Sequence, residues 1–234
     1  MDSCRCLRYI WQMSMILPSD LAYKLTKQLK ISGNPLLSPH RELAEWINVH
    51  YDVQVLNLIL DTIEPGSQPR LNVILERAAD EERFRQKPFL NFDKDAQLAV
   101  HQQFASLTKK VERQTIDVSR LLVIFSAFER VARIEANQRV TDQEIETLKA
   151  SLADPELWII RTSVDGVTFF LYTDAQLKAH RDMGARDLYM REYSRLTEPY
   201  DEFGYLRTRG VPVSLDSKEN FDTNYQSNWF YYYR

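Results

Sequence analysis

The chain has 234 residues, a net charge of −3 and 44% hydrophobic residues, a composition typical of a globular protein. The slight acidity disfavours nucleic acid as the main partner, because binding phosphates requires a basic surface. No run of residues reaches the ~18–20 apolar positions that span a bilayer, so we expect no membrane segment. A chain of this length can bury a core without disulfides or metals.

The first 17 residues are expected to form a leader or a poorly specified N-terminal segment. Residues 9–17 are fairly apolar, but they lack the length and the cleavage site of a signal peptide. Cys4 and Cys6 are one residue apart and make no disulfide framework. This cysteine usage favours a reducing compartment, and we expect a cytoplasmic protein.

Two helices are predicted before the first strand. In residues 20–29 one face recurs at helical spacing after Ser19 as the N-cap, and it consists of Leu21, Leu25 and Leu29, or of Leu25, Gln28 and Leu29. The Ser38-Pro39 pair opens a second helix that runs to about His50, since proline is favoured at the first helical position.

A hairpin is predicted next, from an apolar run at residues 53–60 and an alternating run at residues 71–75. The first strand is so uniformly apolar that we expect it to be covered on both faces and to lie in the centre of its sheet. Residues 76–87 then form a charged helix, whose carboxylates are expected to pair with arginines on a solvent-facing side.

Three helices are predicted in the middle of the chain. Asp93 or Asp95 caps the first of them. Residues 121–134 fit a helix, although their run LLVIFSAF also has the composition of a strand. Thr141 and Glu144 have the spacing of a capping box for the third helix.

A second hairpin is predicted at residues 157–173, where Asp165-Gly166 is a strong turn signal, and a helix follows at residues 175–183. Both halves of the chain thus contain helix, hairpin and helix. Residues 38–117 and 118–190 form either a pseudo-repeat or two instances of a common α+β unit. We expect one α+β domain over residues 18–234, with a mostly antiparallel sheet built from two hairpins and C-terminal strands and packed against several helices.

The last 35 residues hold ten of the 27 aromatic side chains, and residues 228–234 resemble a final strand. Aromatic residues are enriched at protein interfaces because they bury a large area. They also close cores and protect sheet edges, which is the alternative interpretation. The candidate protein-binding residues are Tyr200, Tyr205, Trp229, Tyr231, Tyr232 and Tyr233.

No catalytic motif is present in the sequence. It lacks a nucleophile elbow, a glycine-rich phosphate loop and the paired Cys or His spacing of a zinc site. We therefore predict no catalytic residue, no metal ligand and no cofactor. Dispersed carboxylates together with His101 or His180 leave one alternative, a metal-dependent hydrolase or nuclease.

The sequence accordingly predicts a non-catalytic protein that binds another protein, as an inhibitor of the immunity type or as an adaptor. The acidic balance and the aromatic C-terminal segment favour this interpretation over the enzyme. No motif resembles a known family.

Overall fold

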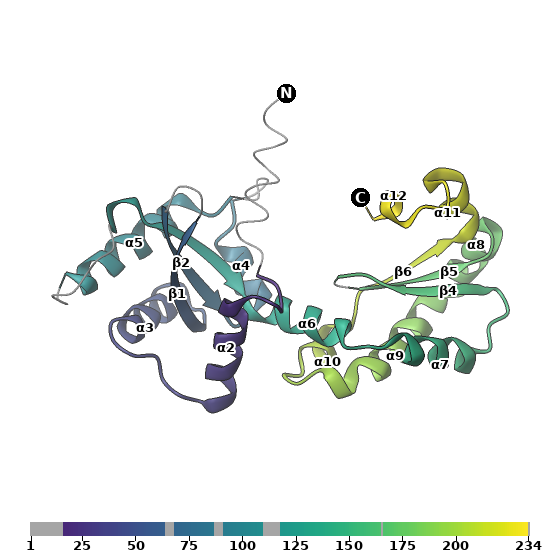
Figure 1. Cartoon of the computed structure of the whole chain (residues 1–234), viewed down its shortest axis with the longest axis horizontal. Helices are drawn as coiled ribbons and strands as arrows, with labels where there is room; N and C mark the ends of the chain where they lie inside the picture. The colour runs from purple at the N-terminus through teal and green to yellow at the C-terminus, as the bar shows by residue number, and fades with distance from the viewer. Residues whose placement is uncertain (1–15, 64–67, 87–90, 110–117, 165, 234) are drawn as a thin grey trace, which may run out of the picture. The chain divides into compact units, whose positions relative to one another are not determined.

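The structure is a computed structural model that describes residues 16–63, 68–86, 91–109, 118–164 and 166–233. Its contacts divide the chain into two compact units, which we name unit 1 (Met1–Val131) and unit 2 (Ala132–Arg234) (Figure 1). Each unit packs helices on a three-stranded sheet, so the predicted α+β class is confirmed. The expectation of one domain over residues 18–234 stays a prediction.

The predictions for the N-terminus fall mostly outside the described residues. The expected leader is described only at its last two positions, and Cys4 and Cys6 lie outside the description. Among the helices that are described, none is both long enough and apolar enough to cross a membrane.

In unit 1 the sheet has the order β1-β2-β3, and helices precede, connect and follow the strands. The strands β1 and β2 form the predicted hairpin, and β3 pairs with β2 in parallel. The sheet is therefore mixed rather than purely antiparallel. The elements are α2 (Leu21–Ser32), α3 (His40–Tyr51), β1 (Val55–Ile63), β2 (Gln68–Leu75), α4 (Ala78–Arg83), α5 (Lys94–Thr108), the 3-10 turn η1 (Val118–Arg120), β3 (Leu122–Ala127) and α6 (Phe128–Gln138), which continues into unit 2.

Helices α3 and α5 pack on one face of this sheet, where Leu43, Ile47 and Phe104 are buried. Helix α2 packs against β1 with a different face from the one predicted. Its buried residues are Tyr23 and Thr26, whereas Leu21 and Leu25 are 69% and 40% exposed. The packed face is instead set by the Tyr23 ring, which stacks on Phe128, and by Thr26, which accepts a hydrogen bond from the side-chain amide of Asn57. The helix also begins after Asp20 rather than after Ser19.

Two strand predictions in unit 1 need correction. Within the described residues, β1 pairs only with β2, so it lies at an edge and β2 is central. Both α2 and α3 contact β1. The run is apolar because helices cover the strand, and not because the strand has a neighbouring strand on each side. Residues 121–134 are a buried strand, β3, followed by the start of α6, and not one helix. The composition of this run is compatible with a helix or a strand, and its parallel pairing with β2 selects the strand.

In unit 2 the sheet has the order β4-β5-β6, again with an antiparallel hairpin and a third, parallel strand. The side chains of Thr141 and Thr173 begin α7 and α8 with full capping boxes, as predicted for Thr141. The elements are α7 (Asp142–Leu152), β4 (Leu157–Thr162), β5 (Val167–Leu171), α8 (Asp174–Asp182), α9 (Ala185–Thr197), the 3-10 turn η2 (Glu198–Tyr200), α10 (Tyr205–Arg209), β6 (Val213–Ser217), α11 (Lys218–Tyr225) and α12 (Trp229–Tyr232).

The two faces of the second sheet are covered differently. Helices α7, α9 and α10 lie on one side of the sheet, and α11 and α12 lie on the other (Figure 1). On the first side, Phe169 stacks on Tyr189 with ring centroids 4.4 Å apart. On the second side, the Phe170 ring is 0% exposed and contacts aromatic rings of α11 and α12. The second side therefore has an aromatic core of its own.

The two units repeat the same order of elements, since α3-β1-β2-α4-α5-β3-α6 is matched by α7-β4-β5-α8-α9-β6-α11, with α10 inserted before β6. Both hairpins have a register shift next to the first residue of the first strand, Val55 or Leu157. After the central strand, the carbonyl of Glu76 accepts from the Glu129 amide, and the carbonyl of Tyr172 accepts from the Glu219 amide. That the halves arose by duplication stays a prediction.

Candidate functional site

The structure does not bring the six predicted binding residues together. Tyr205 is the first residue of α10 and is buried, with 2% of its surface exposed. The Tyr200 hydroxyl donates to Oε1 of Glu144 at 2.7 Å, which links η2 to the start of α7. The other four residues lie on α12 or directly after it: Trp229, Tyr231, Tyr232 and Tyr233.

The C-terminal segment is a helix and not the predicted strand. Asn228 caps α12 by accepting a hydrogen bond from the amide of Phe230, which initiates the turn. Trp229 stacks on Phe221 with ring centroids 4.0 Å apart, and the Tyr232 hydroxyl donates to Oδ2 of Asp216 at 2.6 Å. Trp229 and Tyr232 therefore cover the second face of the sheet, which agrees with the alternative interpretation of the aromatic residues as core.

Three aromatic side chains of the same segment remain exposed. Phe230 is 69% exposed, and Tyr231 and Tyr233 are each 45% exposed. We name these three residues the C-terminal aromatic edge. Phe230 was not among the predicted binding residues, although it is the most exposed of the three. The Asn228 cap was the signal in the sequence that could have revealed the helix.

An open pocket lies beside this segment, between α8 and the junction of β6 with α11, and we name it the α8 pocket. It has a volume of about 390 Å³. Asp216 and Asn220 line one side of it. Helix α8 lines the other side with Asp174, Leu177, Lys178, Arg181 and Asp182. Three carboxylates thus face two cationic groups, and the lining has a formal charge of −1.

Asp216 lines the α8 pocket and also contacts Tyr232 of α12. Its Oδ1 accepts from the Ser217 amide at 2.7 Å and from the Asn220 side-chain amide at 2.8 Å. Its Oδ2 accepts from the hydroxyl of Tyr232, the residue between two members of the C-terminal aromatic edge. The carboxylate is held in place by these donors, and Oδ2 retains the capacity to accept a further hydrogen bond.

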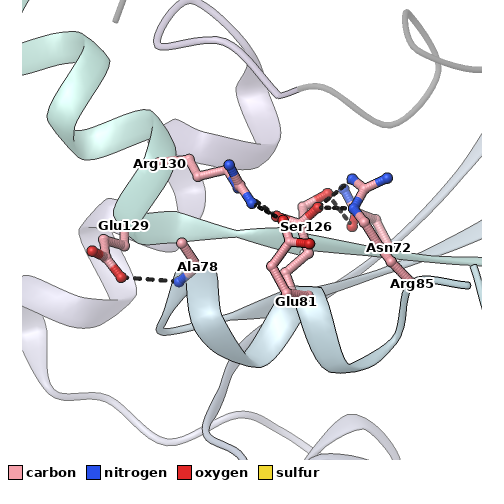
Figure 2. Close-up of polar contacts among 8 residues, drawn as sticks. Asn72, Ala78, Glu81, Arg85, Ser126, Glu129 and Arg130 are labelled. Carbon is pink, nitrogen blue, oxygen red and sulfur yellow. Dashed lines mark hydrogen bonds and ion pairs between the residues drawn. The ribbon is translucent and has the colours of Figure 1, made fainter. Parts of the chain in front are cut away.

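Unit 1 has a polar network at the matching place, between α4 and the junction of β3 with α6 (Figure 2). Glu81 is 3% exposed, and its carboxylate accepts from Nε of Arg85 at 3.0 Å and from Nε of Arg130 at 2.9 Å. Arg130 also donates to Glu82. The side chain of Arg130 therefore reaches from α6 to α4.

The buried carboxylates correct the prediction for residues 76–87. That segment was expected to be a solvent-facing, salt-bridged helix, but Glu76 and Glu81 are 6% and 3% exposed. Glu76 is paired with Lys30 of α2 at 2.8 Å. The predicted pairing of opposite charges is present, but several of the partners come from α2 and α6, and their packing buries the acids.

Asp154, His180 and Tyr189 form a hydrogen-bonded group that links the loop after α7 to α8 and α9. Nε2 of His180 and the Tyr189 hydroxyl lie 2.9 and 2.6 Å from Oδ2 of Asp154. Nδ1 of His180 lies 3.0 Å from the Gln176 carbonyl oxygen, which can only accept, so Nδ1 carries a proton. Burial alone would lower the pKa of His180, but its hydrogen bonds to Asp154 and Gln176 and the charges of Asp154 and Glu156 outweigh burial and raise the pKa.

The stability of unit 2 is therefore expected to depend on pH through His180. Because the folded pKa lies above the reference value of 6.5, the imidazolium contributes stability that is complete below that value and is lost as the pH rises through the folded pKa. The free energy of unfolding should fall with rising pH, by at most about 1.4 kcal/mol per pH unit for one proton. Urea titrations of the wild type and of His180→Gln between pH 6 and pH 9 measure this slope as their difference.

An equal slope in the wild type and in His180→Gln would show that the ring is neutral in the folded protein.

The enzyme alternative stays a prediction. Both nitrogens of His180 are engaged by structural partners, and His101 lies on α5 in unit 1. Among the described residues, no group of three or more His, Cys, Asp and Glu side chains is placed to hold a metal ion. No family model, curated protein or solved structure matches the chain, so its function has to be argued from this geometry.

Proposed function

We propose that this protein is non-catalytic and binds another protein through the C-terminal aromatic edge, as an inhibitor or an adaptor in the cytoplasm. The observation that supports the proposal is the exposure of Phe230, Tyr231 and Tyr233 on one short segment. Such rings offer a large contact area that is characteristic of interface hot spots.

The support beneath the edge strengthens this proposal. Trp229 is stacked on Phe221, and the guanidinium carbon of Arg161 lies over the Trp229 ring, 4.7 Å from its centroid. Tyr232 is fixed by its hydrogen bond to Asp216. The exposed rings therefore lie next to two residues, Trp229 and Tyr232, that are held in place. Because the segment is already ordered, less conformational entropy is lost on binding.

The proposal predicts that Phe230→Ala combined with Tyr231→Ala weakens partner binding at least about tenfold, since truncation of a hot-spot aromatic residue costs about 2 kcal/mol or more. A photo-crosslinking amino acid at position 233 of the full chain identifies the partner in cells. Its Kd for the purified wild type and the double variant is then measured by calorimetry. The thermal midpoint of the double variant should stay unchanged, because both side chains are exposed.

Met183→Ala is the matched control, because Met183 is also an apolar residue of unit 2 and is 72% exposed. It should retain the wild-type Kd. An unchanged Kd for the double variant, or an equal loss for Met183→Ala, would contradict the proposed interface.

A further inference from the structure

The α8 pocket and the network around Glu81 occupy equivalent places in the two units. The α4 amide of Ala78 donates to the Glu129 carboxylate at 2.9 Å, and the α8 amide of Asp174 donates to the Glu219 carboxylate at 3.0 Å. The parallel ladders end with Leu75 opposite Ala127 and with Leu171 opposite Ser217. These anchors align α4 with α8, β3 with β6, and α6 with α11, residue by residue.

The alignment shows which side chains differ between the two places. The position of buried Glu81 is taken in unit 2 by Leu177, and the position of Glu82 by Lys178. On the opposite side, Asn220 stands where unit 1 has Arg130, and Asp216 stands where it has Ser126. All seven residues that line the α8 pocket thus correspond to unit 1 residues of the network or next to it, and the remaining pairs are Asp174 with Ala78, Arg181 with Arg85 and Asp182 with Gln86.

The space in the pocket follows from these differences. In unit 1 the Arg130 guanidinium reaches Glu81 and Glu82 across the gap between α6 and α4. Asn220 is too short for that reach, and its amide turns back to Asp216 of its own segment. The volume that corresponds to the guanidinium is therefore open in unit 2, while a new carboxylate, Asp216, stands at its base.

We propose that the α8 pocket receives the guanidinium of an arginine side chain of the bound protein, which takes the place that Arg130 occupies within unit 1. This inference rests on the proposed function, since it names the chemistry of the partner. The arginine donates to Oδ2 of Asp216, and the aromatic edge that flanks Tyr232 contacts the surrounding surface of the partner. Arginine suits this site because its planar, charged fork donates to a carboxylate from several N–H groups.

The charges of the lining favour a cation over an anion. Arg181 already donates to the carbonyl of Leu215 at 2.9 Å. Lys178 lies four residues from both Asp174 and Asp182 on α8, a spacing at which opposite charges attract one another. Strand β6, which carries Asp216, contains no Lys or Arg. The lining of the α8 pocket has a net negative charge.

The test uses small probes, so it does not depend on finding the partner. The full chain, labelled with ¹⁵N, is titrated with N-acetyl-arginine amide, and backbone amide shifts are followed by NMR. Saturable shifts are expected in α8 and in residues 216–220, with a Kd of roughly 1–10 mM for a single side chain. The neutral N-acetyl-citrulline amide has the same shape and should bind at least about tenfold more weakly, because the carboxylate gains no charge-assisted bond.

Two variants locate the binding. Asn220→Arg supplies the guanidinium from within the chain and should abolish the shifts, whereas Asn220→Ala leaves the pocket open and should keep them. If Asn220→Arg does not fold, Asp182→Asn serves in its place, since Asp182 is exposed, and it should weaken probe binding severalfold. Equal binding of the citrulline probe, saturation of the same amides by N-acetyl-glutamate amide, or binding that survives Asn220→Arg would overturn the inference.

The two proposals fail in different ways. If Phe230→Ala with Tyr231→Ala releases the partner but Asn220→Arg does not change the Kd of the partner, the interface stands and the arginine site is wrong. If the arginine probe binds as expected and the double variant retains the partner, the pocket is real and the proposed interface is wrong.

Discussion

Replacement of Phe170 by alanine is expected to lower the free energy of unfolding of unit 2 by about 3–5 kcal/mol, the range for a fully buried phenylalanine. The Phe170 ring is 0% exposed and stands at the centre of the second face of the sheet. It lies 5.3 Å from both the Trp229 and the Tyr232 ring centroids. The cavity would remove the surface against which α12 packs, and it cannot be filled without moving the chain after β6.

Urea titration followed by hydrogen exchange measures this loss for unit 2 separately from unit 1. Amides of β4, β5 and α11 should exchange faster in the variant, while those of β2 and β3 should keep their wild-type rates. Phe230→Ala is the matched control, because it deletes the same side chain from the neighbouring exposed surface and should change stability by less than about 0.5 kcal/mol. A loss below about 1 kcal/mol for Phe170→Ala would contradict the assignment of this ring to a core.

The local part of the fold was predictable from the sequence, because its signals lie within a few residues of one another. The turn at Gly166 depends on a short-range backbone hydrogen bond, and the cap at Asp93 and the capping box at Thr141 depend on short-range bonds between side chains and backbone amides. The division into two sheets was not predictable in this way. The third strands, β3 and β6, join their hairpins by parallel pairing across intervening helices, and no local pattern encodes that register.

The candidate site was predictable only in part, for the same reason. The aromatic composition directed attention to the last residues, but the helical turn begun by Asn228 decides which rings are buried and which are exposed. The α8 pocket unites Leu177 with Asp216 and Asn220, which the sequence separates and parallel pairing of β5 with β6 brings together. The burial of Glu81 likewise depends on Arg130, 49 residues away.

Replacement of Glu81 by leucine, the residue that unit 2 has at the equivalent position, is expected to destabilise unit 1 by about 2–3 kcal/mol. Loss of one member of a buried ion pair costs about 3–5 kcal/mol, because it leaves an uncompensated charge. The smaller value is expected here because the Arg130 side chain is 47% exposed and can turn to solvent. Arg85 cannot do so as readily, since its side chain is 18% exposed and lies over the Phe92 ring.

The same substitution at Glu82 is the control, because that side chain is 48% exposed and is paired with Arg130 at the surface. Glu82→Leu should change the free energy of unfolding by less than about 1 kcal/mol. Adding Arg85→Met to Glu81→Leu should recover part of the loss, because the stranded cation is then replaced by an apolar side chain of similar length. Equal losses at positions 81 and 82, or no recovery in the double variant, would show that the network around Glu81 is not a buried charge network. The α8 pocket would then have no counterpart in unit 1 in which an arginine occupies the equivalent place.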